Sequence, residues 1–118
     1  MTHLDPGNPA QVAHAIANMM DELEEQTAVY RGDIEQAARS SAAYKRAWAQ
    51  SMLSVIASSS GRMTVAEREA HVEIATNDDR VVAEVHEAQA KATREALNSL
   101  RVRLDSARSL GANLRAQT

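Results

Sequence analysis

The chain has 118 residues, a formal net charge of −3 at pH 7, 44% hydrophobic residues and only 3% aromatic residues. This length indicates one domain, and the small number of aromatic residues excludes an ordinary globular core. The absence of cysteine excludes disulfides, thiolate metal sites and a cysteine nucleophile, and the acidic balance argues against indiscriminate coating of nucleic acid.

Residues 1–8 contain Asp5, Pro6 and Gly7 and no apolar run. We expect a flexible N-terminal segment here that is neither a signal peptide nor a membrane anchor. No later stretch approaches the ~20 apolar residues of a membrane span. A cytoplasmic protein that makes no membrane contact is therefore expected.

The first helix is predicted over residues 9–57, because Asn8 can cap it and Pro9 suits the first helical position. Apolar residues then recur in alternating steps of four and three, which is typical of a coiled coil. This seam comprises Ile16, Met20, Leu23, Thr27, Tyr30, Ile34, Ala37, Ser41, Tyr44, Trp48, Ser51 or Met52, and Val55.

Residues 58–63 are predicted to form a turn, in which Gly61 supplies a left-handed backbone conformation. The sequence Thr64-Val65-Ala66-Glu67 then has the pattern of a capping box. This pattern predicts that a second helix begins at residue 64.

The second helix is predicted over residues 64–116, with a seam whose steps are mostly of four residues. Such steps indicate an eleven-residue rhythm and a locally straight helix. A kink is expected at residues 76–79, where Thr, Asn and Asp side chains compete for backbone hydrogen bonds, and a three-helix chain is the alternative. The seam comprises Val81, Val85, Ala88, Ala92, Ala96, Leu100, Leu104 and Ala107.

A loop centred near Gly61 sets Trp48 against Ile74 and Leu23 against Leu100. The predicted fold is therefore all-α, a long antiparallel two-helix coiled-coil hairpin. Helices rich in alanine bury little area, so an isolated hairpin would be marginal. We expect a homo-oligomer, either a four-helix bundle or something larger, that buries the seam and the apolar residues beside it.

Four histidines, His3, His14, His71 and His86, are candidate metal ligands, but no Glu-x-x-His motif accompanies them. No nucleophile motif or phosphate-binding glycine loop occurs either. We therefore expect no cofactor, no metal and no enzymatic activity.

Residues 91–118 carry a net charge of +4. Their arginines, Arg94, Arg101, Arg103, Arg108 and Arg115, are candidate contacts for nucleic acid. The favoured interpretation is that they pair with Asp21, Glu22, Glu24 and Glu25 across the hairpin or between subunits. Trp48 and Tyr44 could similarly stack on bases, but their seam positions favour packing.

The second half of the chain and the Tyr44–Trp48 stretch resemble small helical proteins encoded by tailed bacteriophages, particularly those of actinobacteria. The resemblance rests on Ala96-Leu97, Leu100-Arg101, Leu104, Ala107-Arg108-Ser109-Leu110 and Leu114-Arg115. It implies an accessory role near phage DNA replication or recombination, in the host cytoplasm. A weaker resemblance is to secreted helical hairpins of actinobacteria with a Trp-x-Gly turn, where this chain has Trp48-Ala49-Gln50.

The expected function is a non-enzymatic oligomeric interaction or scaffold module whose partners are its own copies or another phage or host protein. Nucleic-acid binding through the C-terminal arginines is one alternative, and a secreted partner protein is the other.

Overall fold

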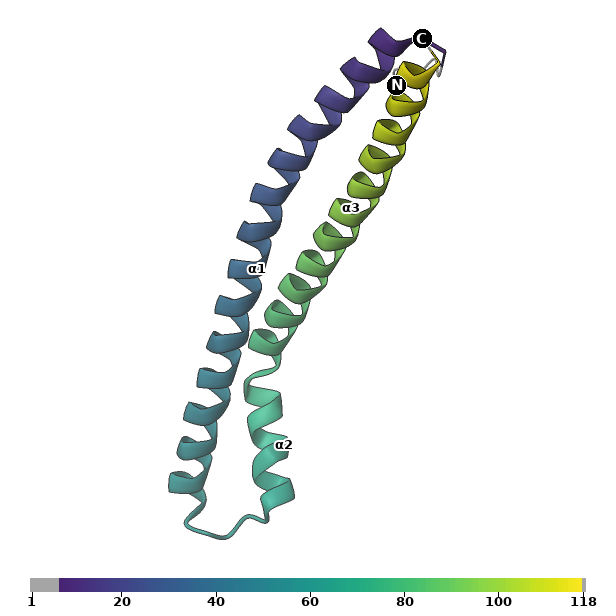
Figure 1. The fold of residues 1–118 in the computed structure, drawn as a ribbon. Coiled ribbons are helices and arrows are strands. Elements are labelled where there is room, and N and C mark those ends of the chain that lie inside the picture. Colours follow the sequence, from purple (N-terminus) through teal and green to yellow (C-terminus); the bar gives the residue numbers. More distant parts are fainter. Residues whose placement is uncertain (1–6, 118) are drawn as a thin grey trace. The chain divides into compact units, whose positions relative to one another are not determined.

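The computed structural model describes residues 7–117, which form helices and the short segments that join or flank them, with no strand among them (Figure 1). Helix α1 spans Pro9–Ser59, α2 spans Val65–Ala75 and α3 spans Asn77–Ala116. A short turn joins α1 to α2, so that α2 and α3 return antiparallel to α1. The all-α hairpin is thereby confirmed. Residues 1–6 of the expected N-terminal segment, including His3, lie outside the described residues.

The helix ends follow from their capping residues. Asn8 Oδ1 accepts hydrogen bonds from the backbone N–H groups of Ala10 (3.0 Å) and Gln11 (3.3 Å), directly before Pro9 begins α1. In the turn, Gly61 has φ +77°, as the sequence predicts, and Ser60 also lies in the left-handed region at +52°. Thr64 Oγ1 then accepts from Glu67 N–H (3.2 Å), which starts α2 one residue later.

The return arm is interrupted at Thr76, so the prediction of one helix over 64–116 is replaced by its three-helix alternative. Thr76 is buried, and its hydroxyl donates to the Val72 carbonyl oxygen at 2.7 Å, which also accepts from Thr76 N–H at 2.9 Å. Arg80 N–H still donates to the Thr76 carbonyl oxygen at 3.0 Å. The interruption is therefore a single-residue break that backbone hydrogen bonds still cross.

The chain divides into two compact units. The terminal unit contains Met1–Arg31 and Lys91–Thr118, and the turn unit contains Gly32–Ala90. Helices α1 and α3 each contribute residues to both units.

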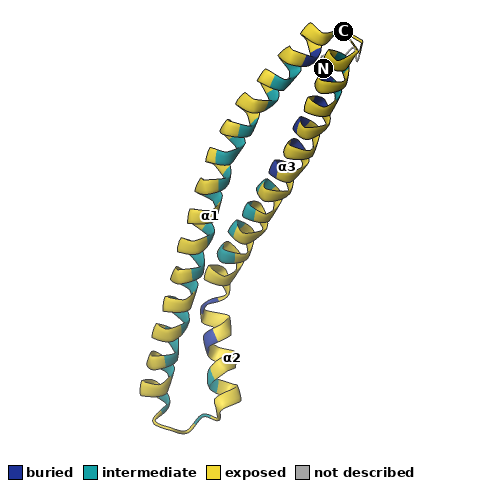
Figure 2. Ribbon diagram, in the orientation of Figure 1, coloured by how far each residue is buried: buried dark blue, intermediate teal, exposed yellow. Residues whose placement is uncertain are grey.

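The core of the terminal unit is a leucine seam on α3. Leu97, Leu100 and Leu104 are at most 3% exposed, and the buried positions continue through Ala107 and Gly111 (Figure 2). These positions alternate in steps of three and four, which is a heptad repeat rather than the predicted eleven-residue rhythm. The predicted seam passed through Ala96 instead of Leu97, but leucine buries more apolar area than alanine and therefore decides which side faces inward.

The register of the terminal unit differs slightly from the prediction. A Cβ atom on Gly111 would lie 3.5 Å from Val12 Cγ1 and 3.6 Å from Ile16 Cδ1, whereas a loop centred on residue 61 sets Gly111 opposite residue 11. The turn between Ser59 and Val65 is centred one residue later, which accounts for part of this shift.

The turn unit is packed more sparsely. Its buried residues are Val72 and Thr76, and most inward positions of α1 and α3 are half-buried. On α1 these positions follow a heptad repeat: Asp33, Ala37, Ser40, Tyr44, Ala47 and Ser51. Several of them are small or polar, so this unit buries little apolar area.

Five residues predicted to fill the hairpin core are exposed in the single chain: Met20, Ile34, Ile74, Val81 and Val85. On α3, the buried leucines define the inward face. Counting back from Leu97 and Leu100 in steps of seven residues leads to Ala90, Ala83 and His86, and not to Val81 or Val85. On α1, Met19 and Asp33 are half-buried where Met20 and Ile34 are exposed, whereas the other predicted seam positions of this helix are half-buried. The prediction that these five residues fill the core of the hairpin is therefore wrong, and their role in an oligomer stays a prediction.

Other seam residues lie closer to their predicted places. Leu100 and Leu104 are buried, and Ile16, Leu23, Tyr30, Tyr44, Trp48 and Val55 are half-buried. The predicted packing of Trp48 on Ile74 is wrong, because the Ile74 side chain is 79% exposed.

Candidate functional site

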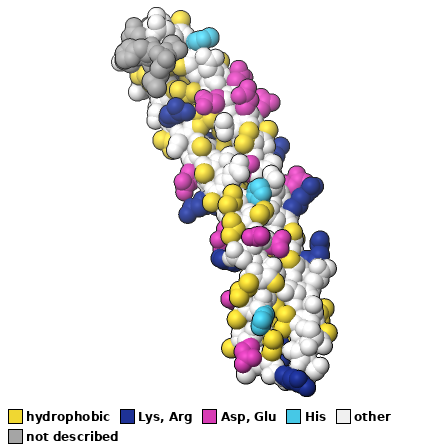
Figure 3. Space-filling model, turned by 180° about the vertical axis from the view of Figure 1, so that it is seen from behind, with side chains coloured by type: hydrophobic (Ala, Val, Ile, Leu, Met, Phe, Trp, Pro, Cys, Tyr) yellow, Lys and Arg dark blue, Asp and Glu magenta, His cyan; other side chains and the backbone are white. Residues whose placement is uncertain are grey.

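The apolar residues that the hairpin leaves exposed form the first candidate site. Alongside residues already named, they include Val29, Leu53, Ile56, Val65, Val82 and Val102. On the face drawn in Figure 3, hydrophobic side chains lie among acidic and basic ones rather than inside a patch of one charge.

A group of exposed or half-buried apolar residues lies along one side of α1 in the turn unit. Ile34, Trp48, Met52 and Ile56 fall within about a quarter turn of one another on this helix. Ile34 and Ile56 are 44% and 47% exposed, and Trp48 and Met52 are half-buried. We call these four residues the α1 flank.

Two grooves of the turn unit lie on the side of the α1 flank. Tyr44 and Arg80 line both grooves. The first groove is also lined by Glu73 and Ile74. The second is also lined by Ser41, Lys45, Glu84 and Glu87. Ser41 and Lys45 lie on the same helical face of α1 as Ile34 and Met52. The grooves therefore border the α1 flank with acidic residues from α2 and α3.

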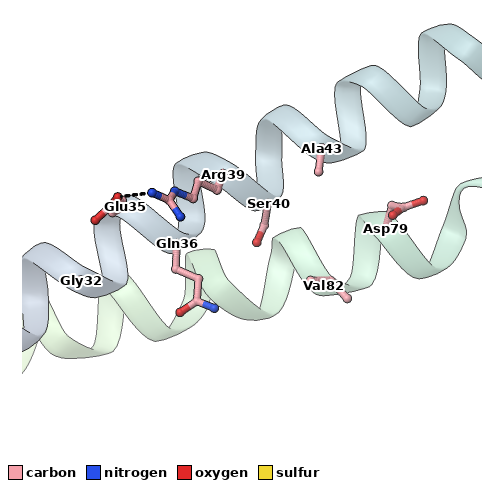
Figure 4. A pocket seen from close by; sticks show the side chains of 8 residues that line it. All are labelled: Gly32, Glu35, Gln36, Arg39, Ser40, Ala43, Asp79 and Val82. Atoms are coloured by element: carbon pink, nitrogen blue, oxygen red, sulfur yellow. Dashed lines mark hydrogen bonds and ion pairs between the residues drawn. The ribbon is translucent and has the colours of Figure 1, made fainter.

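A third groove of the turn unit, about 670 Å³, lies between α1 and α3 (Figure 4). Gln36 extends from α1 toward α3, and Val82 and Asp79 line the α3 side. Arg39 Nη2 lies 2.6 Å from Glu35 Oε1, so this pair is already neutralised along α1. The Ser40 hydroxyl lines the groove and forms no hydrogen bond with a described carboxylate.

The C-terminal arginines form the second candidate site, and all five are exposed. Arg103 Nη2 lies 3.9 Å from Glu22 Oε1, a long contact between two groups that are more than half exposed. This is one of the pairings that the sequence predicts. The guanidinium groups of Arg94, Arg101 and Arg108 form no ion pair or hydrogen bond with any described residue.

Sequence reasoning grouped these arginines without separating the two sides of α3. Arg94, Arg101 and Arg108 are seven residues apart and therefore share one side of the helix, whereas Arg103 projects from a different side. The heptad spacing in the sequence was the signal that could have distinguished them. Once the leucine seam fixes the inward face of α3, this seven-residue spacing shows which side of the helix the arginines occupy.

The histidines are not gathered into a metal site. Among residues 7–117, no group of three or more His, Asp or Glu side chains is placed to hold a metal ion. His86 is half-buried at an inward position of α3, and His14 and His71 are exposed. Within the same residues, no helix is long and apolar enough to cross a membrane.

Comparisons with protein families, with curated proteins and with solved structures found no match to this chain.

Proposed function

We propose that the protein is a non-enzymatic helical interaction module that works as a homo-oligomer. The supporting observation is the imbalance of apolar burial within the described residues. Eleven large apolar side chains are 44% exposed or more, whereas six hydrophobic residues are buried. Single exposed apolar residues are normal on a monomer, but an excess of this size favours an interface.

A second copy of this chain is the occupant that fits the α1 flank. Residues 32–59 of α1 carry three basic and two acidic side chains, and Glu35 neutralises Arg39, so that Lys45 and Arg46 remain near the α1 flank; residues 65–90 carry seven acidic and two basic side chains. A two-fold axis parallel to the helices sets α1 of one copy against α2 and α3 of the other. Opposite charges then face each other, and Ile74 of the partner subunit reaches the level of Trp48 and Met52.

Light scattering at micromolar concentration tests the proposal. We expect a dimer or a larger assembly, and a compact monomer at all concentrations would contradict the proposed function. Ile74→Glu should raise the dissociation constant at least tenfold, because it places a charge in the apolar contact. Leu53→Glu is the matched control, since Leu53 is 69% exposed on another side of α1, and it should leave association unchanged.

Trp48 provides a second readout because it is the single tryptophan of the chain. Its emission should shift to longer wavelength as the protein is diluted and the α1 flank becomes exposed to water. An oligomer whose Trp48 emission is independent of concentration would exclude this surface and leave the oligomer itself in place.

The biological setting that we propose follows the resemblance to phage proteins: an accessory of phage DNA metabolism in the host cytoplasm. Location of the gene beside phage replication or recombination genes would support this setting. Location in an unrelated chromosomal operon would contradict it.

A further inference from the structure

A row of arginines runs along one side of α3 in the terminal unit. Arg94, Arg101 and Arg108 are seven residues apart on a continuous helix, so their attachment points are about 10.5 Å apart. Each lies immediately C-terminal to an inward position of the heptad seam, Thr93, Leu100 and Ala107. Because the buried leucines fix the orientation of α3, the three guanidinium groups leave the seam on the same side.

The row has little internal neutralisation. Arg108 lines a groove of about 570 Å³ together with Arg31 and Glu24 of α1, so two guanidinium groups share this groove with one carboxylate. No ion pair within 4.0 Å joins Glu24 to either arginine. By contrast, Arg103 on another side of α3 has Glu22 as its neighbour. Asp105 lies on the same side of α3, four residues after Arg101 and three before Arg108, and no ion pair within 4.0 Å joins it to either arginine. Glu22 of α1 compensates Arg103, so the guanidinium groups of the row are left without an ion pair.

We propose that the row formed by Arg94, Arg101 and Arg108 binds the phosphate backbone of nucleic acid. Guanidinium groups present planar forks of N–H donors that match phosphate oxygens, and a regular row of them can follow a regular row of phosphates. The inference is independent of the proposed homo-oligomer, because it rests on the side of α3 in the terminal unit and not on the α1 flank.

The chemistry of the row also selects the kind of nucleic acid. Proteins that bind single strands usually stack bases on aromatic side chains, and the three aromatic residues of this chain, Tyr30, Tyr44 and Trp48, are half-buried at seam positions. Contacts to phosphates alone carry no sequence information. The row therefore binds duplex without sequence preference and binds single strands more weakly.

Fluorescence anisotropy with a 30-base-pair duplex of mixed sequence tests the inference, with a single strand of the same length as a second arm. Across 25 to 200 mM salt we expect the logarithm of the association constant for duplex to fall with a slope of about −3, one unit for each arginine. The single strand should bind more weakly at every salt concentration.

The variant Arg101→Gln/Arg108→Gln should bind duplex at least tenfold more weakly at the lowest salt and reduce the slope to about −1. Arg39→Gln/Arg46→Gln removes the same charge from α1 of the turn unit, and Arg103→Gln removes the arginine beside Glu22. Both controls should keep the wild-type slope. Circular dichroism checks that each variant retains its helical content.

Three results would overturn the inference. One is the absence of salt-sensitive duplex binding by the wild type, and another is equal weakening by the row variant and the α1 control. The third is equally tight binding of poly-glutamate, which would show that the row recognises negative charge in general rather than phosphate.

Discussion

At the scale of single residues, Gly111 is the glycine with the tightest surroundings among Gly32, Gly61 and Gly111, since side chains of α1 lie close to it. This residue is buried on α3 against Val12 and Ile16 of α1. Sequence reasoning placed no emphasis on it, because a glycine within a helical pattern signals only reduced helix propensity. Its inward position follows from the heptad that begins at Leu97, which the alanine-rich pattern of the second helix obscured.

Gly111→Ala should stabilise the protein by about 0.5–1 kcal/mol, because alanine favours the helix and restricts the unfolded chain. The added Cβ would meet Val12 and Ile16 at ordinary van der Waals distances of 3.5 and 3.6 Å. Urea denaturation measures the change. Gly111→Val is the matched test of space: its extra methyl groups should destabilise the protein, and equal gains from both variants would contradict close packing at this position.

At the scale of elements, the ends of the helices could be predicted because local chemistry determines them. Asn8, Gly61 and Thr64 act within three or four residues of their own positions, and the structure places both ends of α1 and the start of α2 within two residues of those expected. The rotation of α1 about its axis depends on the opposing helix. The sequence pattern placed Met20 and Ile34 in the seam and left Met19 and Asp33 outside it. Burial in the structure reverses that order at both places.

The break between α2 and α3 lies at the start of the segment that the sequence marks as weak. The Thr76 hydroxyl uses the Val72 carbonyl oxygen as its acceptor, which is the competition with the helix ladder that such side chains introduce. Whether the helix kinks or breaks depends on one or two backbone hydrogen bonds. The sequence therefore left both outcomes open.

Thr76→Val should destabilise the protein by about 1 kcal/mol, since it removes a buried hydrogen bond and keeps the side-chain shape. Thr27→Val removes the same kind of bond, from Thr27 Oγ1 to the Leu23 carbonyl oxygen at 2.7 Å, at a half-buried site within a continuous helix. Water can replace that bond more readily, so its loss should have the smaller effect in urea denaturation. A Thr76→Val protein as stable as the wild type would show that the buried bond contributes nothing.

At the scale of the whole molecule, buried apolar residues are distributed unequally between the two units. The terminal unit holds Val12 and the leucine seam, and the turn unit holds Val72 (Figure 2). Segments with few buried apolar contacts open locally at low free-energy cost. The candidate sites divide in the same way, with the α1 flank in the sparsely packed unit and the arginine row beside the leucine seam.

Hydrogen exchange should report this inequality. In dilute protein, amides of residues 97–111 should exchange more slowly than those of residues 77–90, because the leucine seam must open to expose them. Raising the concentration should narrow the difference in exchange rate, because the second copy that we propose would cover part of the turn unit. Equal protection of the two segments in dilute protein would contradict the unequal packing.

If association buries the apolar residues that the hairpin leaves exposed, it must also stabilise the folded chain. Thermal unfolding, followed by circular dichroism at 222 nm over a hundredfold range of protein concentration, measures this stabilisation directly. Since a partner that binds the folded chain stabilises it by mass action, the melting temperature should rise by about 5 °C across that range. A melting temperature that stays constant while unfolding remains reversible would show that the single hairpin is already the complete folded protein.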